Sequence, residues 1–136
     1  MLLYPSAFHP VQSDPGSVSV AVVDHGSYVA YLNATPSQSH EQLHGWARAR
    51  VSHLLDDEAI FVHEDASVED RPFHGGLGSC VIDDYVTKFG HHRFYEIACI
   101  VSGARHESVV VAAAHPSDWE RFGRTLEQAV VSFVVR

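Results

Sequence analysis

Residues 107–114 read ESVVVAAA, and the run 109–114 within them is apolar at every position. A strand with one face in water alternates apolar and polar residues, whereas a strand buried on both faces has no need to alternate. The run therefore predicts a strand that is covered on both sides. Such cover requires a sheet that lies between two further layers, and this requirement limits the folds that the whole chain can adopt.

Other segments have the composition of strands. Segments 17–23 and 27–33 are rich in β-branched and aromatic residues, and they flank a turn that contains Gly26, as expected for a hairpin. The opening LLYPSAFHPV contains Pro5 and Pro10, which suit an edge strand. We expect further strands at 59–64, 78–86, 93–101 and 107–114. Turns at Gly90 and Gly103 would make the last three strands an antiparallel meander.

Two helices are expected. Ser39 with Gln42 has the spacing of a capping box, and the pattern predicts a helix over about 40–56. One face of this helix is apolar: Leu43, Trp46, Ala47, Val51, Leu54 and Leu55. Ser117 with Glu120 predicts the start of a second helix, whose apolar stripe is Trp119, Phe122, Leu126, Ala129, Val130 and Phe133.

The resulting order is β-β-β-α-β-β-β-β-α. Strands in runs with only two long helices predict an α+β fold, and the doubly covered strand makes it a three-layer α/β/α sandwich with a central antiparallel sheet. The length of 136 residues is that of one domain, so we expect a single domain over residues 1–136.

Charge and hydropathy narrow the possible partners. The formal net charge is −8, and the nine Lys and Arg residues are scattered, so the chain has no basic stripe for nucleic acid or for an anionic membrane. No window approaches the roughly 18 apolar residues of a membrane span, and the first ten residues have neither the basic start nor the apolar run of a signal peptide. We expect a protein or small-molecule partner, no cofactor, and a monomer or homodimer.

The two cysteines fall opposite each other if the strands at 78–86 and 93–101 form a hairpin. A turn centred on Phe89 and Gly90 pairs Cys80 with Cys99, close enough for a disulfide. Two buried free thiols are the alternative. A disulfide implies export and would require that the sequence be a mature or truncated form. Otherwise the thiols are reduced in a cytoplasm.

The same register places Asp83 opposite Glu96, and Asp84 adds a third carboxylate. Like charges directly across a ladder repel each other. A buried pair could hold a shared proton or a cation. We expect instead that these groups face water where no helix covers the sheet, or that an Arg such as Arg71 or Arg105 lies between them.

Residues 40–44, HEQLH, match the H-E-x-x-H pattern of zinc proteases. In that chemistry His40 and His44 would bind zinc and Glu41 would act as general base. Two features oppose this interpretation. His40 would lie in the first turn of the predicted helix, which frays, and the sequence after His44 has no metzincin continuation. A zinc-dependent hydrolase remains the alternative function, although weak zinc binding by the two histidines is favoured over catalysis.

Histidines are unusually frequent. The chain has 11, so mild acidification can add many positive charges to a net charge of −8. A third hypothesis is therefore association that depends on pH through these side chains, with solvated histidines of no special role as the alternative.

Three stretches together resemble a known group: the opening YPSAFHPV, the strand YLNATP before the first helix, and the C-terminal PSDWERFGRTLEQAVVSF. With the element order, the chain resembles the Mog1/PsbP-like domains, in particular small actinobacterial secreted or lipoprotein-type members. The resemblance implies an α/β/α sandwich and a role as a binding or assembly factor, and it supplies no catalytic residues. The leading interpretation is a non-catalytic binding or scaffold domain of the bacterial cell envelope.

Overall fold

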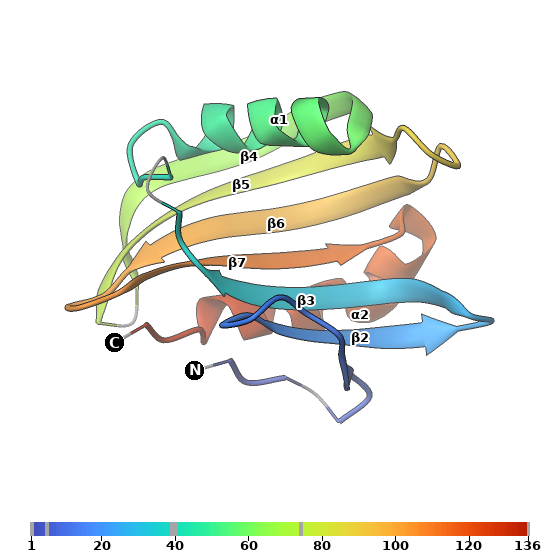
Figure 1. The fold of residues 1–136 in the computed structure, drawn as a ribbon, viewed down its shortest axis with the longest axis horizontal. Coiled ribbons are helices and arrows are strands. Elements are labelled where there is room, and N and C mark those ends of the chain that lie inside the picture. The colour runs from blue at the N-terminus through green and yellow to red at the C-terminus, as the bar shows by residue number, and fades with distance from the viewer. Residues whose placement is uncertain (1, 5, 39–40, 74, 136) are drawn as a thin grey trace.

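The computed structural model describes residues 2–4, 6–38, 41–73 and 75–135 (Figure 1). Its elements are β1 (His9–Val11), β2 (Val18–Asp24), β3 (Ser27–Pro36), α1 (Trp46–Asp57), β4 (Ala59–Phe73), β5 (Gly76–Thr87), β6 (Arg93–Ser102), β7 (Glu107–Ala114) and α2 (Pro116–Val131). All strands belong to one antiparallel sheet of order β1-β2-β3-β7-β6-β5-β4. The predicted element order is confirmed.

The sheet lies between the two helices, as the uninterrupted apolar run predicted (Figure 1). The run forms β7, the middle strand. On one face, α2 packs over β7, β6 and β3. Val110 and Ala112 of β7 are buried there with Leu126 of α2. On the other face, α1 packs over β4, β5 and β6. Because α1 lies toward β4 while α2 lies toward β3, the described helices leave β3 and much of β7 uncovered on the α1 side.

The strand pairing follows from local signals. In the β2–β3 turn, His25 and Gly26 have φ angles of 50° and 78°, and two successive positive φ angles match the twist of a hairpin. In the β5–β6 hairpin, the register pairs Cys80 with Cys99 and Asp83 with Glu96, as predicted.

The predicted starts of both helices are wrong. α1 begins at Trp46 rather than near residue 40, with Gly45 as a left-handed N-cap residue (φ 73°). Trp46 is buried, and its Nε1 donates a hydrogen bond to the Ala98 carbonyl at 2.9 Å. Glu69 of β4 accepts a hydrogen bond from the Gly45 N–H at 2.6 Å. Tertiary contacts therefore determine where this helix begins, and a local capping box does not.

α2 begins at Pro116, before the predicted cap at Ser117, and His115 is its N-cap residue. Proline suits the first helical position because it has no N–H to leave unpaired and its φ is already helical.

β4 is much longer than the predicted segment 59–64. It continues to Phe73 through register irregularities, two of them between Glu64 and Ala66 and between Val68 and Arg71. These bulges interrupt the alternation of apolar and polar residues from which strands are predicted. The predicted strand therefore ended too early, at residue 64. Among the described residues, no helix is long and apolar enough to cross a membrane.

Candidate functional site

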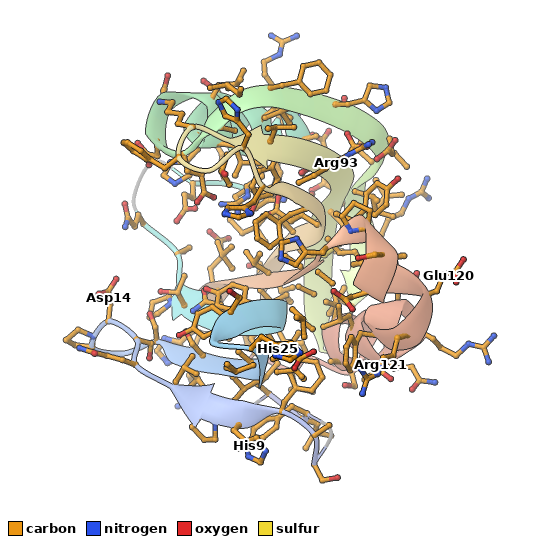
Figure 2. All side chains as sticks on the ribbon, turned by 90° about the vertical axis from the view of Figure 1, so that its right-hand side faces the viewer. His9, Asp14, His25, Arg93, Glu120 and Arg121 are labelled. Atoms are coloured by element: carbon orange, nitrogen blue, oxygen red, sulfur yellow. A yellow bond between two sulfur atoms is a disulfide. The ribbon has the colours of Figure 1, made fainter. Side chains whose placement is uncertain are left out.

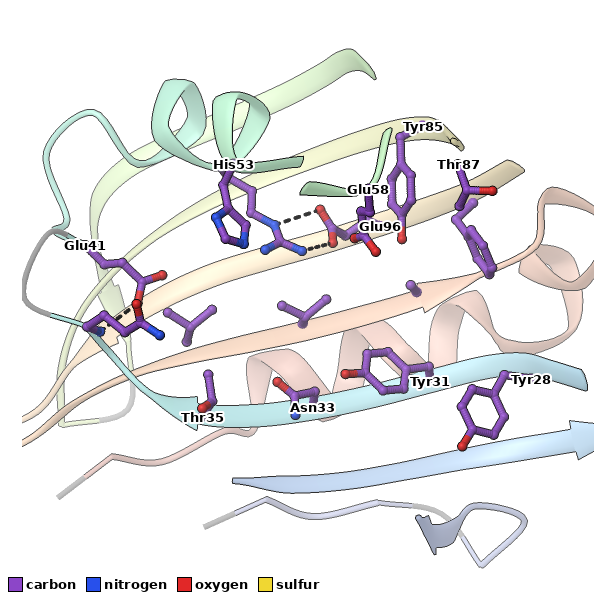
Figure 3. Close-up of a pocket in the computed structure, with 16 residues that line it drawn as sticks. Tyr28, Tyr31, Asn33, Thr35, Glu41, His53, Glu58, Tyr85, Thr87 and Glu96 are labelled. Carbon is purple, nitrogen blue, oxygen red and sulfur yellow. Dashed lines mark hydrogen bonds and ion pairs between the residues drawn. The ribbon is translucent and has the colours of Figure 1, made fainter. Parts of the chain in front are cut away.

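A groove of about 400 Å³ occupies the side of the sheet that α1 leaves open (Figure 3). Val109, Val111 and Ala113 of β7 form its apolar floor. α1 and the ends of β5 and β6 form one wall, and β3 forms the other. The residues that line these walls are Tyr28, Tyr31, Asn33, Thr35, Gln38, Glu41, Arg50, His53, Glu58, Tyr85, Thr87, Phe94 and Glu96.

The β3 wall is polar because of strand alternation. Tyr31, Asn33 and Thr35 point into the groove (Figure 3). Leu32 and Ala34 alternate with them and face the α2 side, where Leu32 is buried in the core and Ala34 packs against it. One strand therefore carries core residues on one face and potential ligand contacts on the other.

The opposite wall contains a buried ion pair. Arg50 of α1 donates two hydrogen bonds to the Glu96 carboxylate, one from Nε at 3.2 Å and one from Nη2 (Figure 3). The Glu96 side chain is 1% exposed and that of Arg50 is 14% exposed. Burial opposes the charge on Arg50, but the adjacent Glu96 carboxylate raises the pKa of Arg50 above its ordinary value. Arg50 therefore keeps its positive charge although it is largely buried.

Asp83 lies beside this pair and is 0% exposed. Among the described residues, neither of its carboxylate oxygens has a hydrogen-bond partner of ordinary geometry. Burial, and next the neighbouring charge of Glu96, raise the pKa of Asp83 well above its ordinary value. Asp83 is therefore neutral at pH 7, and Glu96 carries the single negative charge that faces Arg50.

This arrangement corrects the expectation that Asp83 and Glu96 face water or share an arginine such as Arg71 or Arg105. α1 covers both carboxyl groups, and the arginine between the layers is Arg50. The sequence contained a signal for Arg50, since it follows Trp46 by four residues and precedes Leu54 by four. A charged residue within an apolar helical stripe is unusual, and we did not single it out.

Asp84 points to the other side of the sheet, so the three carboxylates do not form one cluster. Arg93 Nη2 donates a hydrogen bond to Asp84 Oδ2 at 3.1 Å. His63 and Asp65 of β4 also lie near Asp84, and each of the three offers one ligand atom within 4.8 Å of the others. Arg93 already neutralises much of the charge there.

Three groups at one end of the groove have altered ionisation. Burial is the main cause for each: it raises the pKa of Tyr31, of Tyr85 and of the Glu58 carboxyl above their ordinary values. Both phenols therefore remain protonated hydrogen-bond donors at any physiological pH. Glu58 follows the last residue of α1 and directs its carboxylate toward Tyr85 (Figure 3).

The HEQLH segment is not helical over its described residues 41–44, because α1 begins after it. His40 lies outside the described residues. Glu41 Oε1 accepts a hydrogen bond from the backbone N–H of Gln38 at 2.7 Å, and His44 Nδ1 lies 3.3 Å from Glu69 Oε2. The helical geometry on which the zinc protease pattern depends was therefore wrongly predicted.

Cys80 and Cys99 form a disulfide between β5 and β6 on the α2 side of the sheet. Cys99 is fully buried in the main core, and Cys80 packs against its edge. An apolar hollow beside Cys80 is lined partly by Val68, Phe73 and Val131.

No protein-family profile and no curated protein sequence matches the chain. Solved structures do match. CyanoP, the cyanobacterial PsbP of Synechocystis, superposes with a TM-score of 0.66 at 15% identity, over 99% of this chain and 85% of its own. PA94 of Pseudomonas aeruginosa, whose function is unknown, gives 0.59 at 12% identity, over 95% and 81%. LpqN, involved in cell envelope biogenesis of Mycobacterium tuberculosis, gives 0.51 at 8% identity, over 98% and 80%. The chain therefore has a PsbP-like fold.

Proposed function

We propose that this protein is a non-catalytic binding domain whose ligand site is the groove between α1 and β3. The observation that carries the proposal is the groove itself. Its volume of about 400 Å³ lies within the range of small-molecule sites, and an apolar floor between polar walls is the usual composition of such sites. The walls stand on a helix and on strands of the sheet, so the site is formed before any ligand binds.

An exported or cell-envelope location fits this proposal. The Cys80–Cys99 bond is of a kind that persists in oxidising compartments and is rare in the cytosol. LpqN, which shares the fold, is itself involved in cell envelope biogenesis. Mass spectrometry of the protein isolated without reductant from its native host would test the location, since a cytoplasmic protein would carry free thiols.

A substitution in the floor tests the binding site. Ala113 lies between Tyr31 and Glu96 in the sheet, so Ala113→Phe fills the groove. Val23→Phe adds a similar ring at an exposed position of β2 and serves as the control. We expect at least one of a set of neutral, cationic and anionic short-chain amphiphiles to raise the melting temperature of wild type and of the control, but not of Ala113→Phe. Circular dichroism checks that both variants fold.

Two results would contradict the proposal. The first is a folded Ala113→Phe variant that binds the same compounds as wild type, or a wild-type protein that binds none of them. The second is metal-dependent peptidase activity that Glu41→Gln abolishes, since this would restore the alternative of a zinc hydrolase.

A further inference from the structure

The charges in the groove are unequally compensated. Arg50 and Glu96 neutralise each other, and Glu41 accepts a hydrogen bond from the backbone. His53 lies 3.1 Å from Asp57, which is outside the groove. Within the described part of the chain, Glu58 is the lining carboxylate for which no hydrogen bond or ion pair is found. The Glu58 carboxylate therefore has no direct hydrogen-bonded or ion-paired partner, and Arg50, at longer range, favours its ionised form.

Tyr85 on one wall and Tyr31 on the other both lie near enough to Glu58 to be affected by its charge. Tyr85 packs against Phe94 with ring centroids 5.6 Å apart, and Phe94 also stacks on His115. Tyr31 lies along β3 at the edge of the floor, and Tyr28 points from β3 toward β2 (Figure 3). The faces of such rings attract organic cations, and the attraction grows when water is excluded.

The apolar floor of the groove sets a further requirement on the ligand. Val109, Val111 and Ala113 continue from this end of the groove toward Thr35 and Glu41 at the other (Figure 3). A ligand whose cationic group lies at Glu58 would therefore place the rest of its body on apolar side chains. An anion would meet Glu41, Glu58 and Glu96, with Arg50 already engaged, so the groove disfavours it.

From these three features we infer that the groove binds a small organic cation with a short apolar chain, its ammonium group held between Glu58 and the tyrosines. This inference rests on the proposed binding function and adds the chemical class of the ligand. It specifies Glu58 as the residue that selects charge, and Tyr31 as one that adds affinity for a cation without affecting neutral ligands.

The test compares three probes of equal chain length by isothermal titration calorimetry: hexyltrimethylammonium, hexanol and hexyl sulfate. We expect the ammonium to bind about tenfold or more tightly than hexanol, and hexyl sulfate to bind most weakly. Glu58→Gln should remove most of the preference for the ammonium. Tyr31→Leu should weaken ammonium binding several-fold and leave hexanol binding unchanged.

Glu120→Gln is the matched control, because this substitution removes the same charge from the outer surface of α2 (Figure 2). It should bind all three probes like wild type. Equal or tighter binding of hexanol or hexyl sulfate, or an unchanged preference in Glu58→Gln, would overturn the inference. If hexanol or hexyl sulfate bound as tightly as the ammonium and Ala113→Phe blocked their binding, the proposed binding function would stand and the preference for cations would be rejected. If neither these probes nor any other amphiphile bound, the binding function and the preference for cations would both be rejected.

Discussion

Asp83 and Glu96 illustrate how one residue sets the ionisation of its neighbours. Two carboxyl groups that face each other in a buried ladder cannot both ionise without a large cost. Arg50 compensates one negative charge through its hydrogen bonds to Glu96. The lower-energy state is therefore a charged Glu96 and a protonated Asp83, and the proton on Asp83 becomes part of the native structure.

This proton makes stability depend on pH in an unusual direction. The pKa of Asp83 is raised above its ordinary value of 3.8, which it regains in the unfolded chain. Between the two pKa values the native state holds a proton that the unfolded state has released. Asp83 therefore lowers the free energy of unfolding as pH rises above about 4.

Asp83→Asn cannot ionise, and we expect it to be more stable than wild type at pH 8 by at least about 1 kcal/mol. The advantage should shrink toward pH 4. Urea unfolding between pH 4 and 8 measures both effects, with the exposed Asp56→Asn as control. A variant that is less stable than wild type at pH 8 would show that Asp83 is ionised in the native state.

Removing Arg50 should have the opposite effect. Arg50→Met leaves Glu96 buried without its partner, and we expect a loss of about 3–5 kcal/mol in the free energy of unfolding. The double variant Arg50→Met/Glu96→Leu removes both charges and should regain most of that loss. Equal losses in the single and double variants, measured by urea unfolding, would show that packing of Arg50 rather than pairing sets the cost.

The sequence predicted the pairing of Asp83 with Glu96 but not their environment. Pairing depends on the β5–β6 turn, which is local. Burial depends on where α1 crosses the sheet, which is decided by distant contacts such as Trp46 with Ala98 and Gly45 with Glu69. For the same reason the groove, which is built from separate elements, could not be predicted from a linear pattern.

Among the elements, β5 and β6 are joined both by backbone pairing and by a covalent bond. They share a long antiparallel ladder, and the Cys80–Cys99 disulfide links them beneath α2. The ladder also carries Asp83, Tyr85 and Glu96 on its α1 face. The same two strands therefore hold part of the core on one side and one wall of the groove on the other.

Loss of the disulfide should weaken this hairpin without changing the fold. The cysteines are separated by 19 residues, and closing a loop of that length stabilises a protein by about 3 kcal/mol. We expect a Cys80→Ala/Cys99→Ala variant to lose about that much in the free energy of unfolding while its circular dichroism spectrum stays native. An unchanged urea midpoint would mean that the native state gains nothing from the bond.

At the scale of the whole molecule, both edges of the sheet are protected against pairing with another chain. β1 is only three residues long and contains Pro10. β4 is long, but bulges interrupt it and it carries Glu64, Asp65 and Asp70 among its exposed residues. Short, charged or irregular edges are the features by which proteins avoid edge-to-edge association.

We therefore expect a monomer at pH 7.5 by sedimentation velocity. The same measurement at pH 5.5 tests association through the histidines, of which His25, His44, His53 and His63 are largely exposed and lie near carboxylates. A larger species at pH 5.5 alone would support that hypothesis, and identical profiles would reject it. A dimer at pH 7.5 would show that an edge or another surface is available for pairing.

The alternation along β3 separates two kinds of constraint on the sequence. Ala30 and Leu32 lie in the core, where a change of volume endangers folding, whereas Tyr31, Asn33 and Thr35 line the groove, where the proposed binding function predicts that a change alters ligand binding. Under the proposed binding function, alternate residues of one strand therefore answer to different requirements, ligand choice on one face and core packing on the other. A library randomised at positions 31, 33 and 35 then becomes a direct route to new binders.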